Sequence, residues 1–147
     1  MAHFSTLLKV VIDVPPAEHD RELAFWQEAL GQALPQFPSP QTEYHGGPLH
    51  GHDMWLLVQR LDDGQPRVHL DMHTDNLDAE VARLEALGAE RVRQVYSWWV
   101  MRDPAGLAFC VLPEPPGSLN EQNARRWDLR DPAGHDSWLR IGHSDFA

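Results

Sequence analysis

Two stretches of the chain carry hydrophobic residues at the three-to-four-residue spacing of an amphipathic helix. Each stretch ends on a glycine, Gly31 or Gly88, where a left-handed cap would close a helix. Pro15 and Pro16 precede the first stretch, and the segment 74–76 offers capping side chains before the second. The predicted apolar faces consist of Leu23, Trp26 and Leu30 in the first helix, and of Leu77, Val81, Leu84 and Leu87 in the second.

Strand-like segments surround both predicted helices. Residues 7–14 are rich in branched aliphatic side chains, and residues 67–73 alternate aliphatic with polar side chains. Prolines interrupt residues 32–53, so no regular strand is predicted there. Further strands are predicted over 54–61 in the first half, and over 91–95, 97–101 and 107–112 in the second.

The order of strand, helix and strands occurs twice. The sequence Glu-Ala-Leu-Gly ends both helical patterns, at residues 28–31 and again at residues 85–88, which favours an internal duplication. We therefore predict an α+β domain over residues 1–113, built from two tandem βαβββ modules with curled mixed sheets around a cavity. The first module is predicted at about 6–62 and the second at about 66–113.

Residues 114–147 follow the second module without continuing its pattern. They are predicted to form an irregular C-terminal extension, with a short helix near 119–127. Two interpretations stay open: the extension covers the pocket or a partner surface, or it is a loosely packed tail.

Composition narrows the class of protein. The chain has 147 residues, which suits one domain with a single core, and no apolar run is long enough to span a bilayer. A formal net charge of −10 without a basic stripe argues against nucleic acid as a partner. A single cysteine and the absence of a signal-peptide pattern predict a reducing, cytoplasmic location. Six tryptophans would build an aromatic-lined pocket if several share an inward face.

Side-chain alternation predicts which polar residues face the cavity. In the segment 67–73, the aliphatic set Val68, Leu70 and Met72 should pack under the helices, which turns His69, Asp71 and His73 inward. The same alternation turns Lys9, Val11 and Asp13 inward from the first strand. Two inward carboxylates are costly unless they are paired, and Lys9, His69 and His73 are the nearest candidate partners.

The remaining candidate ligand contacts come from three other segments. Trp55 and Gln59 share a face of the segment 54–61, and Cys110 points inward from 107–112. On 97–101, either Trp99 or Trp98 faces the cavity, so both are candidates. Cys110 has no basic neighbour in sequence and is more typical of a packed residue than of a nucleophile.

Three segments, in order, resemble the vicinal-oxygen-chelate superfamily, which includes glyoxalases and bleomycin-resistance proteins. The closest similarity is to actinobacterial glyoxalase-like domain proteins, and it covers roughly residues 6–113. The resemblance implies the fold predicted above and a homodimer. It also implies that the chain binds a small molecule. Members of the superfamily include metal-dependent isomerases, epimerases and dioxygenases, and metal-free proteins that sequester antibiotics. The segments are Asp13 through Phe25-Trp26 to Leu30-Gly31, Val68-His69-Leu70-Asp71 with Asp75-Asn76-Leu77-Asp78-Ala79, and Asp103-Pro104-Ala105-Gly106 to Phe109-Cys110-Val111.

The resemblance also implies where a metal would bind. Metal-using relatives carry ligands on the first and last strand of each module, and the corresponding residues here are Val11, Gln59, His69 and Cys110. His69 is the only strong ligand among them, so we expect no metal and no other cofactor. Zinc, nickel, manganese or iron remain the alternatives. Two rival ligand sets are His45, His50, His52 and Asp53 in a glycine-rich loop, and His69, Asp71 and His73 on one strand face.

Three functions stay open on the sequence. The first is a metal-independent binder of a small organic metabolite, with antibiotic sequestration as one form of it. The second is a lyase or isomerase in which His69, assisted by Asp71 or Asp13, moves a proton next to a carbonyl, because the pKa of histidine lies near neutrality. A metal-dependent glyoxalase or dioxygenase is its variant. The third is a non-catalytic interaction module that uses residues 114–147 as its contact surface.

Overall fold

The computed structural model describes residues 2–128 of the chain. Two helices and eight strands follow one another along it. The part of the predicted extension beyond residue 128 lies outside the described residues. The strands and helices are β1 (His3–Val14), α1 (Pro16–Leu30), β2 (Tyr44–Pro48), β3 (Trp55–Arg60), β4 (Arg67–Thr74), α2 (Leu77–Ala86), β5 (Glu90–Val95), β6 (Trp98–Arg102), β7 (Ala108–Pro113) and β8 (Arg125–Trp127).

Both predicted helices are confirmed, and local chemistry explains their ends. α1 begins at Pro16, whose missing N–H costs nothing in the first turn, and Gly31 closes it at φ 65°. α2 begins after Asn76, whose side chain accepts a hydrogen bond from the backbone N–H of Ala79 at 3.1 Å. Neither helix is long and apolar enough to cross a membrane.

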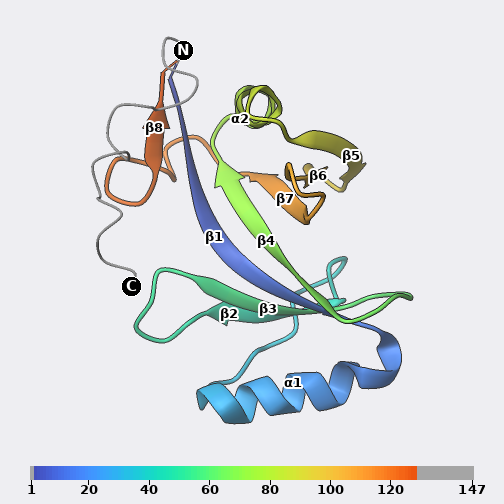
Figure 1. Cartoon of the computed structure of the whole chain (residues 1–147). Helices are drawn as coiled ribbons and strands as arrows, with labels where there is room; N and C mark the ends of the chain where they lie inside the picture. Colours follow the sequence, from blue (N-terminus) through green and yellow to red (C-terminus); the bar gives the residue numbers. More distant parts are fainter. Residues whose placement is uncertain (1, 129–147) are drawn as a thin grey trace, which may run out of the picture.

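All eight strands belong to one open, mixed sheet, with the order β2-β3-β1-β4-β7-β6-β5 and with β8 on the end of β1. β1 and β4 run antiparallel at its centre, while β1 pairs with β3 and β4 pairs with β7 in parallel. The two modules of one chain therefore pair with each other through their first strands (Figure 1). The α+β prediction is confirmed, with one difference: the first module has two strands after its helix, not three.

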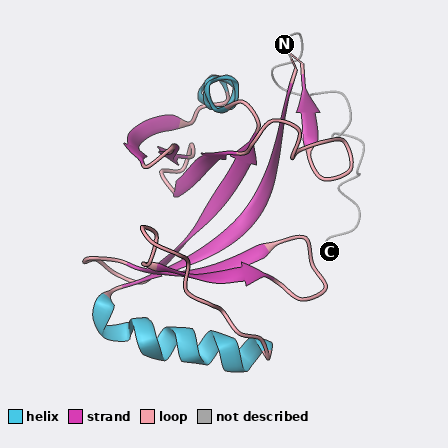
Figure 2. Cartoon of the chain, turned by 180° about the vertical axis from the view of Figure 1, so that it is seen from behind, coloured by secondary structure: helices cyan, strands magenta, loops and turns pink. Residues whose placement is uncertain are grey.

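The helices cover the outer face of the two halves of the sheet and leave its middle uncovered (Figure 2). α1 lies over β3 and β1, and α2 lies over β7 and β1, each above a separate apolar core. Met72 packs against the α2 core as predicted. Val68 and Leu70 do not pack under a helix: their exposed fractions are 61% and 41%, because β4 runs between the two helices. The prediction for these two residues is wrong.

The segment 119–127 is not helical. Its end forms β8, which pairs antiparallel with the start of β1, and turns precede it. The Trp127 indole N–H donates a hydrogen bond to Ser5 Oγ at 2.8 Å. The Arg83 guanidinium of α2 lies 3.8 Å from the centroid of the same indole ring. The residues of β8 are thus held against β1 and α2.

Candidate functional site

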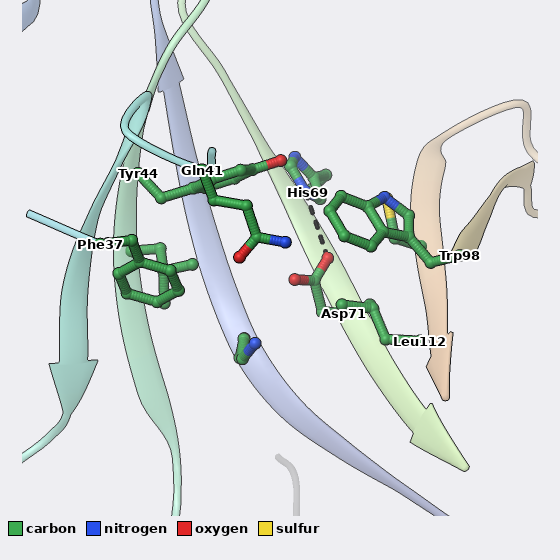
Figure 3. Close-up of a pocket in the computed structure, with 10 residues that line it drawn as sticks. Phe37, Gln41, Tyr44, His69, Asp71, Trp98 and Leu112 are labelled. Carbon is green, nitrogen blue, oxygen red and sulfur yellow. Dashed lines mark ion pairs between the residues drawn. The ribbon is translucent and has the colours of Figure 1, made fainter. Parts of the chain in front are cut away.

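The concave face of the sheet holds a small cavity that is open to solvent. Aromatic walls come from Phe37 and Tyr44 on one side and from Trp98 on the other (Figure 3). His69 and Asp71 of β4 form its polar floor, as strand alternation predicts, with Cys110 of β7 beside them. The two modules of one chain therefore close on a shared site.

A bulge in β1 decides which of its residues face this cavity. The β1–β4 register shifts between Leu7 and Lys9. Lys9 lines the cavity, whereas Leu7 lies on the opposite face of the sheet with Val68 and Leu70. Such a bulge re-aims the side chains that follow it. Without it, Leu7 would face inward by the same alternation as Lys9.

His69 lies between two carboxylates. Its Nδ1 lies 2.6 Å from Asp13 Oδ2, and its Nε2 lies 3.2 Å from Asp71 Oδ1. The second distance is that of an ion pair without the alignment of a hydrogen bond, and Asp71 Oδ1 has no hydrogen-bond partner among the described residues. Arg67 Nε donates to Asp13 Oδ2 at 3.2 Å. The expected pairing of the two inward carboxylates is thus achieved mainly through His69.

The carboxylates keep this imidazole protonated. Burial alone lowers the pKa of His69, but the bonds to Asp13 and Asp71 outweigh burial and raise that pKa to about 11. At neutral pH the residue is therefore an imidazolium. Both of its nitrogens are engaged, so it has no free lone pair with which to accept a proton.

The neighbouring thiol and phenol stay neutral. Burial raises the pKa of Cys110 above its usual value, although the neighbouring His69 opposes the shift. Burial also raises the pKa of Tyr44, whose hydroxyl points toward His69 (Figure 3). Cys110 is therefore a poor nucleophile, as its sequence context indicated, and Tyr44 offers a hydrogen bond to a ligand.

The cavity continues past His69 toward a more cationic end. Tyr44, His69, Trp98 and Cys110 also line the adjoining space, so the two spaces meet at these four residues. Gln59, a predicted ligand contact, lies in this second part, together with Arg67 and Arg93.

Three predicted ligand contacts lie elsewhere. Trp99 packs against the α2 core, so β6 turns Trp98 inward and not Trp99. Trp55 stands beside Lys9, whose Nζ lies 5.6 Å from the indole centroid. His73 is buried, and its Nδ1 lies 2.5 Å from Glu114 Oε1. Neither Trp55 nor His73 lines the two cavity spaces described above.

Sequence reasoning missed the wall formed by the segment 37–44. Phe37 and Tyr44 come from the proline-rich stretch for which no strand was predicted, and so does Gln41. Tyr44 begins β2, and the backbone N–H of Phe37 donates to the carbonyl of Tyr44 at 2.8 Å. Only the aromatic character of the stretch could have signalled a wall.

A family model described as a glyoxalase-like domain matches residues 9–112 of the sequence. The chain belongs to the glyoxalase-like domain family, within the vicinal-oxygen-chelate superfamily. No curated protein matches the chain significantly. The match includes His69, Asp71 and Cys110.

Solved structures share the fold of this glyoxalase-like protein at low sequence identity. Methylmalonyl-CoA epimerase from Mycobacterium tuberculosis has a TM-score of 0.53 at 18% identity, and the match covers 74% of this chain and 88% of that one. A mutant of 4-hydroxymandelate synthase from Streptomyces coelicolor has a TM-score of 0.54 at 14% identity, and the match covers 82% of this chain and 52% of that one. At these identities the likeness establishes the fold alone.

Within residues 2–128, one group of side chains could hold a metal ion. Val11 has no ligand atom, but Asp71 lies beside His69 and Cys110, which occupy two of the ligand positions of the metal-using relatives. Each of these three residues offers one ligand atom, and the three atoms lie within 4.8 Å of one another. Asp71 Oδ1 is buried without a hydrogen bond, and Asp13 orients the His69 ring from behind. Nitrogen, oxygen and sulfur donors together suit zinc, provided that His69 loses its Nε2 proton. When bound, the ion would act as a Lewis acid toward a substrate oxygen.

The rival ligand sets do not come together. No second cluster of three potential ligands occurs within residues 2–128, so His45, His50, His52 and Asp53 do not form a site there. His45 instead stacks near His19, with ring centroids 5.0 Å apart. His73 is bonded to Glu114 and is not part of the group around His69.

Proposed function

We propose that this protein binds a small organic molecule that carries a carbonyl oxygen, with the apolar part of the molecule between Tyr44 and Trp98. The observation that carries this proposal is the meeting of the His69 imidazolium and the Tyr44 hydroxyl on one side of an aromatic-walled cavity. A titratable group that lines a cavity and has a strongly shifted pKa marks a candidate functional site. Aromatic walls with a few polar groups are the usual composition of such a site.

Within this proposal, His69 serves as a fixed positive charge and proton donor. Its Nε2–H faces Asp71, so a ligand oxygen that approaches this face meets both a cation and a carboxylate. The imidazolium stabilises negative charge on a carbonyl oxygen, and Asp71 Oδ1 is the neighbouring group able to accept a proton. An isomerase or lyase reaction at this site would therefore take its base from Asp71 and not from His69.

Tryptophan fluorescence tests the binding proposal. Aromatic ketones, aldehydes and keto acids should quench the wild-type protein, and Trp98→Ala should raise the Kd about tenfold, because a stacked aromatic wall contributes roughly 0.5–1.5 kcal/mol beyond its burial. Trp99→Phe is the matched control, since Trp99 packs in the α2 core. Equal Kd values for wild type and Trp98→Ala would contradict the proposed position of the ligand. Binding without turnover would favour sequestration over an enzyme.

A metal-dependent enzyme is the second candidate, favoured by the convergence of His69, Asp71 and Cys110. Zinc and a proton compete for His69 Nε2 in this arrangement, so zinc affinity should fall by up to about tenfold for each unit that the pH drops below 11. Zinc titration followed by competition with a chromophoric chelator at pH 6.5, 7.5 and 8.5 measures this slope. Zinc affinity that does not change with pH would rule out this ligand set. So would a Cys110→Ser variant that binds zinc with the same affinity and the same pH dependence as the wild type.

We also propose that two copies of the chain associate through the uncovered outer face between α1 and α2. Leu7, Val68, Leu70 and Leu107 expose apolar surface there. Wild-type protein should elute as a dimer in size-exclusion chromatography with light scattering, and Val68→Glu should elute as a monomer. Val92→Glu is the control, because Val92 is a similarly exposed strand residue on β5. A monomeric wild type would contradict this part of the proposal.

A further inference from the structure

Lys9 is the only lysine in the sequence; the other strongly basic side chains are arginines. The two side chains differ in chemistry. A guanidinium stays protonated and is not a nucleophile at neutral pH, whereas a lysine amine can lose its proton and attack a carbonyl carbon. The chain therefore has a single ε-amine, and the fold places it in the cavity.

The position of Lys9 follows from its pairing with β4. Regular alternation from Lys9 to Asp13 opposite β4 turns the lysine to the concave face, where it lines the cavity with Tyr44, His69 and Trp98. Its Nζ lies near the Trp55 ring, at 5.6 Å from the centroid. Across the strand pair, Lys9 is the register partner of Asp71.

No carboxylate of the described residues forms an ion pair with this amine. Asp13 and Asp71 are engaged with His69, and Glu114 is engaged with His73. Burial lowers the pKa of Lys9, and Asp71 and Glu114 oppose that shift only in part. His73, which is also buried close to Lys9, has a lowered pKa for the same reason, with Lys9 as a further cause. The amine is thus half-buried, unpaired and facing a ligand space.

We infer that Lys9 captures an aldehyde or ketone ligand as an imine. The neutral amine attacks the carbonyl carbon: a C–N bond forms, the C=O π electrons move to oxygen, and proton transfer from nitrogen to oxygen gives a carbinolamine. Protonation of the hydroxyl and loss of water then give the protonated imine, and hydrolysis reverses the sequence. The His69 imidazolium is the protonated group that lines the same cavity, and Tyr44 adds a hydroxyl donor. No oxidant or reductant takes part.

This inference rests on the proposed function, because Lys9 attacks the carbonyl carbon of the ligand that the same cavity is proposed to bind. It goes beyond that function in making the contact covalent and in restricting the ligand to aldehydes and ketones. Carboxylic acids and amides would bind the cavity without forming the adduct.

Reductive trapping tests the inference. Benzaldehyde and sodium cyanoborohydride should convert Lys9 to its N-benzyl derivative at pH 7.5 faster than they convert Nα-acetyl-lysine, because the lowered pKa of Lys9 leaves more free amine and the cavity holds the aldehyde beside it. Peptide mass spectrometry assigns the modified residue. Lys9→Arg keeps a cation in place and should remove the ε-amine adduct, and wild type unfolded in urea should react no faster than Nα-acetyl-lysine.

Two outcomes would overturn the inference: folded wild type that labels at Lys9 no faster than Nα-acetyl-lysine, or folded wild type that does not label there. Quenching by benzoic acid, which cannot form an imine, is measured on the same samples. If benzoic acid quenches the wild type and loses affinity in Trp98→Ala while Lys9 stays unlabelled, the imine fails and the proposed binding site stands. If neither quenching nor labelling occurs, both fail.

Discussion

Replacing His69 with glutamine is expected to destabilise the protein by about 3–5 kcal/mol, because it removes the cation between two buried carboxylates. The Asp13 side chain is fully buried, and that of His69 is 11% exposed, so water cannot replace the lost charge. Arg67 remains on Asp13, but Asp71 would keep only Lys9 as a cationic neighbour across the strands. Urea unfolding of wild type and His69→Gln measures the difference.

The pH dependence of stability identifies the cause. The folded pKa of His69, about 11, lies above the usual 6.5 of a histidine, so its contribution to stability is fully present below pH 6.5 and is lost as the pH rises through 11. From this residue the wild type should lose up to about 1.4 kcal/mol of unfolding free energy per pH unit across that window, and His69→Gln should lack that slope. His50→Gln, at an exposed loop position, is the control. Equal slopes in wild type and His69→Gln would mean that His69 is not held as a cation.

The sequence predicts this cluster because strand alternation is a local property. His69 and Asp71 are two residues apart on one strand, and Asp13 occupies an inward position of the first strand, so their shared face follows from a period of two. Which element covers the other face of the same strand is not a local property. Val68 and Leu70 have the pattern of covered residues, but whether a helix lies over them depends on where α1 and α2 dock.

The aromatic wall of Phe37 and Tyr44 could not be predicted from the sequence for a similar reason. β2 contains two glycines and a proline, which disfavour a strand. Gly46 permits the close approach of β2 to β3, because a Cβ at this position would lie 2.3 Å from the carbonyl oxygen of Leu56. The strand that carries Tyr44 is therefore defined by packing against β3 and not by its own propensity. The bulge that turns Leu7 to the outer face also arises from pairing, between β1 and β4.

The short strand β8 shows the same dependence on distant partners. Its three residues, Arg125–Trp127, are too few and too polar to predict a strand. A buried network holds it in place: Glu80 of α2 accepts bonds from Arg83 at 2.7 and 2.9 Å, and Arg83 stacks on Trp127. His3 Nε2 lies 2.6 Å from Glu80 Oε2, the oxygen that also accepts from Arg83 Nε. Glu80 thus joins the start of β1 to α2 and, through Arg83, to β8.

Glu80→Gln is expected to cost about 3–5 kcal/mol of unfolding free energy, because it leaves a buried guanidinium without its counter-ion. Glu80 is fully buried, and the Arg83 side chain is 9% exposed. Glu85→Gln is the matched control on the same helix: Glu85 pairs with Arg91, but its side chain is 38% exposed, so its removal should cost no more than about 1 kcal/mol. Urea unfolding of the two variants compares a buried pair with a surface pair.

The pH profile and hydrogen exchange separate an ionic role for Glu80 from simple packing. Burial raises the pKa of Glu80, but bonds from Arg83 and His3 outweigh it, so the folded pKa lies below the usual 4.5. Its contribution is present above pH 4.5 and is lost as the pH falls through the folded pKa, and Glu80→Gln should lack this acid-side loss. Amides at the start of β1 and in β8 should exchange faster in Glu80→Gln, because both segments depend on the same carboxylate, while amides of β3 keep their protection. Uniformly faster exchange across the sheet would instead assign Glu80 to global stability, without a specific role in fastening β8 to β1.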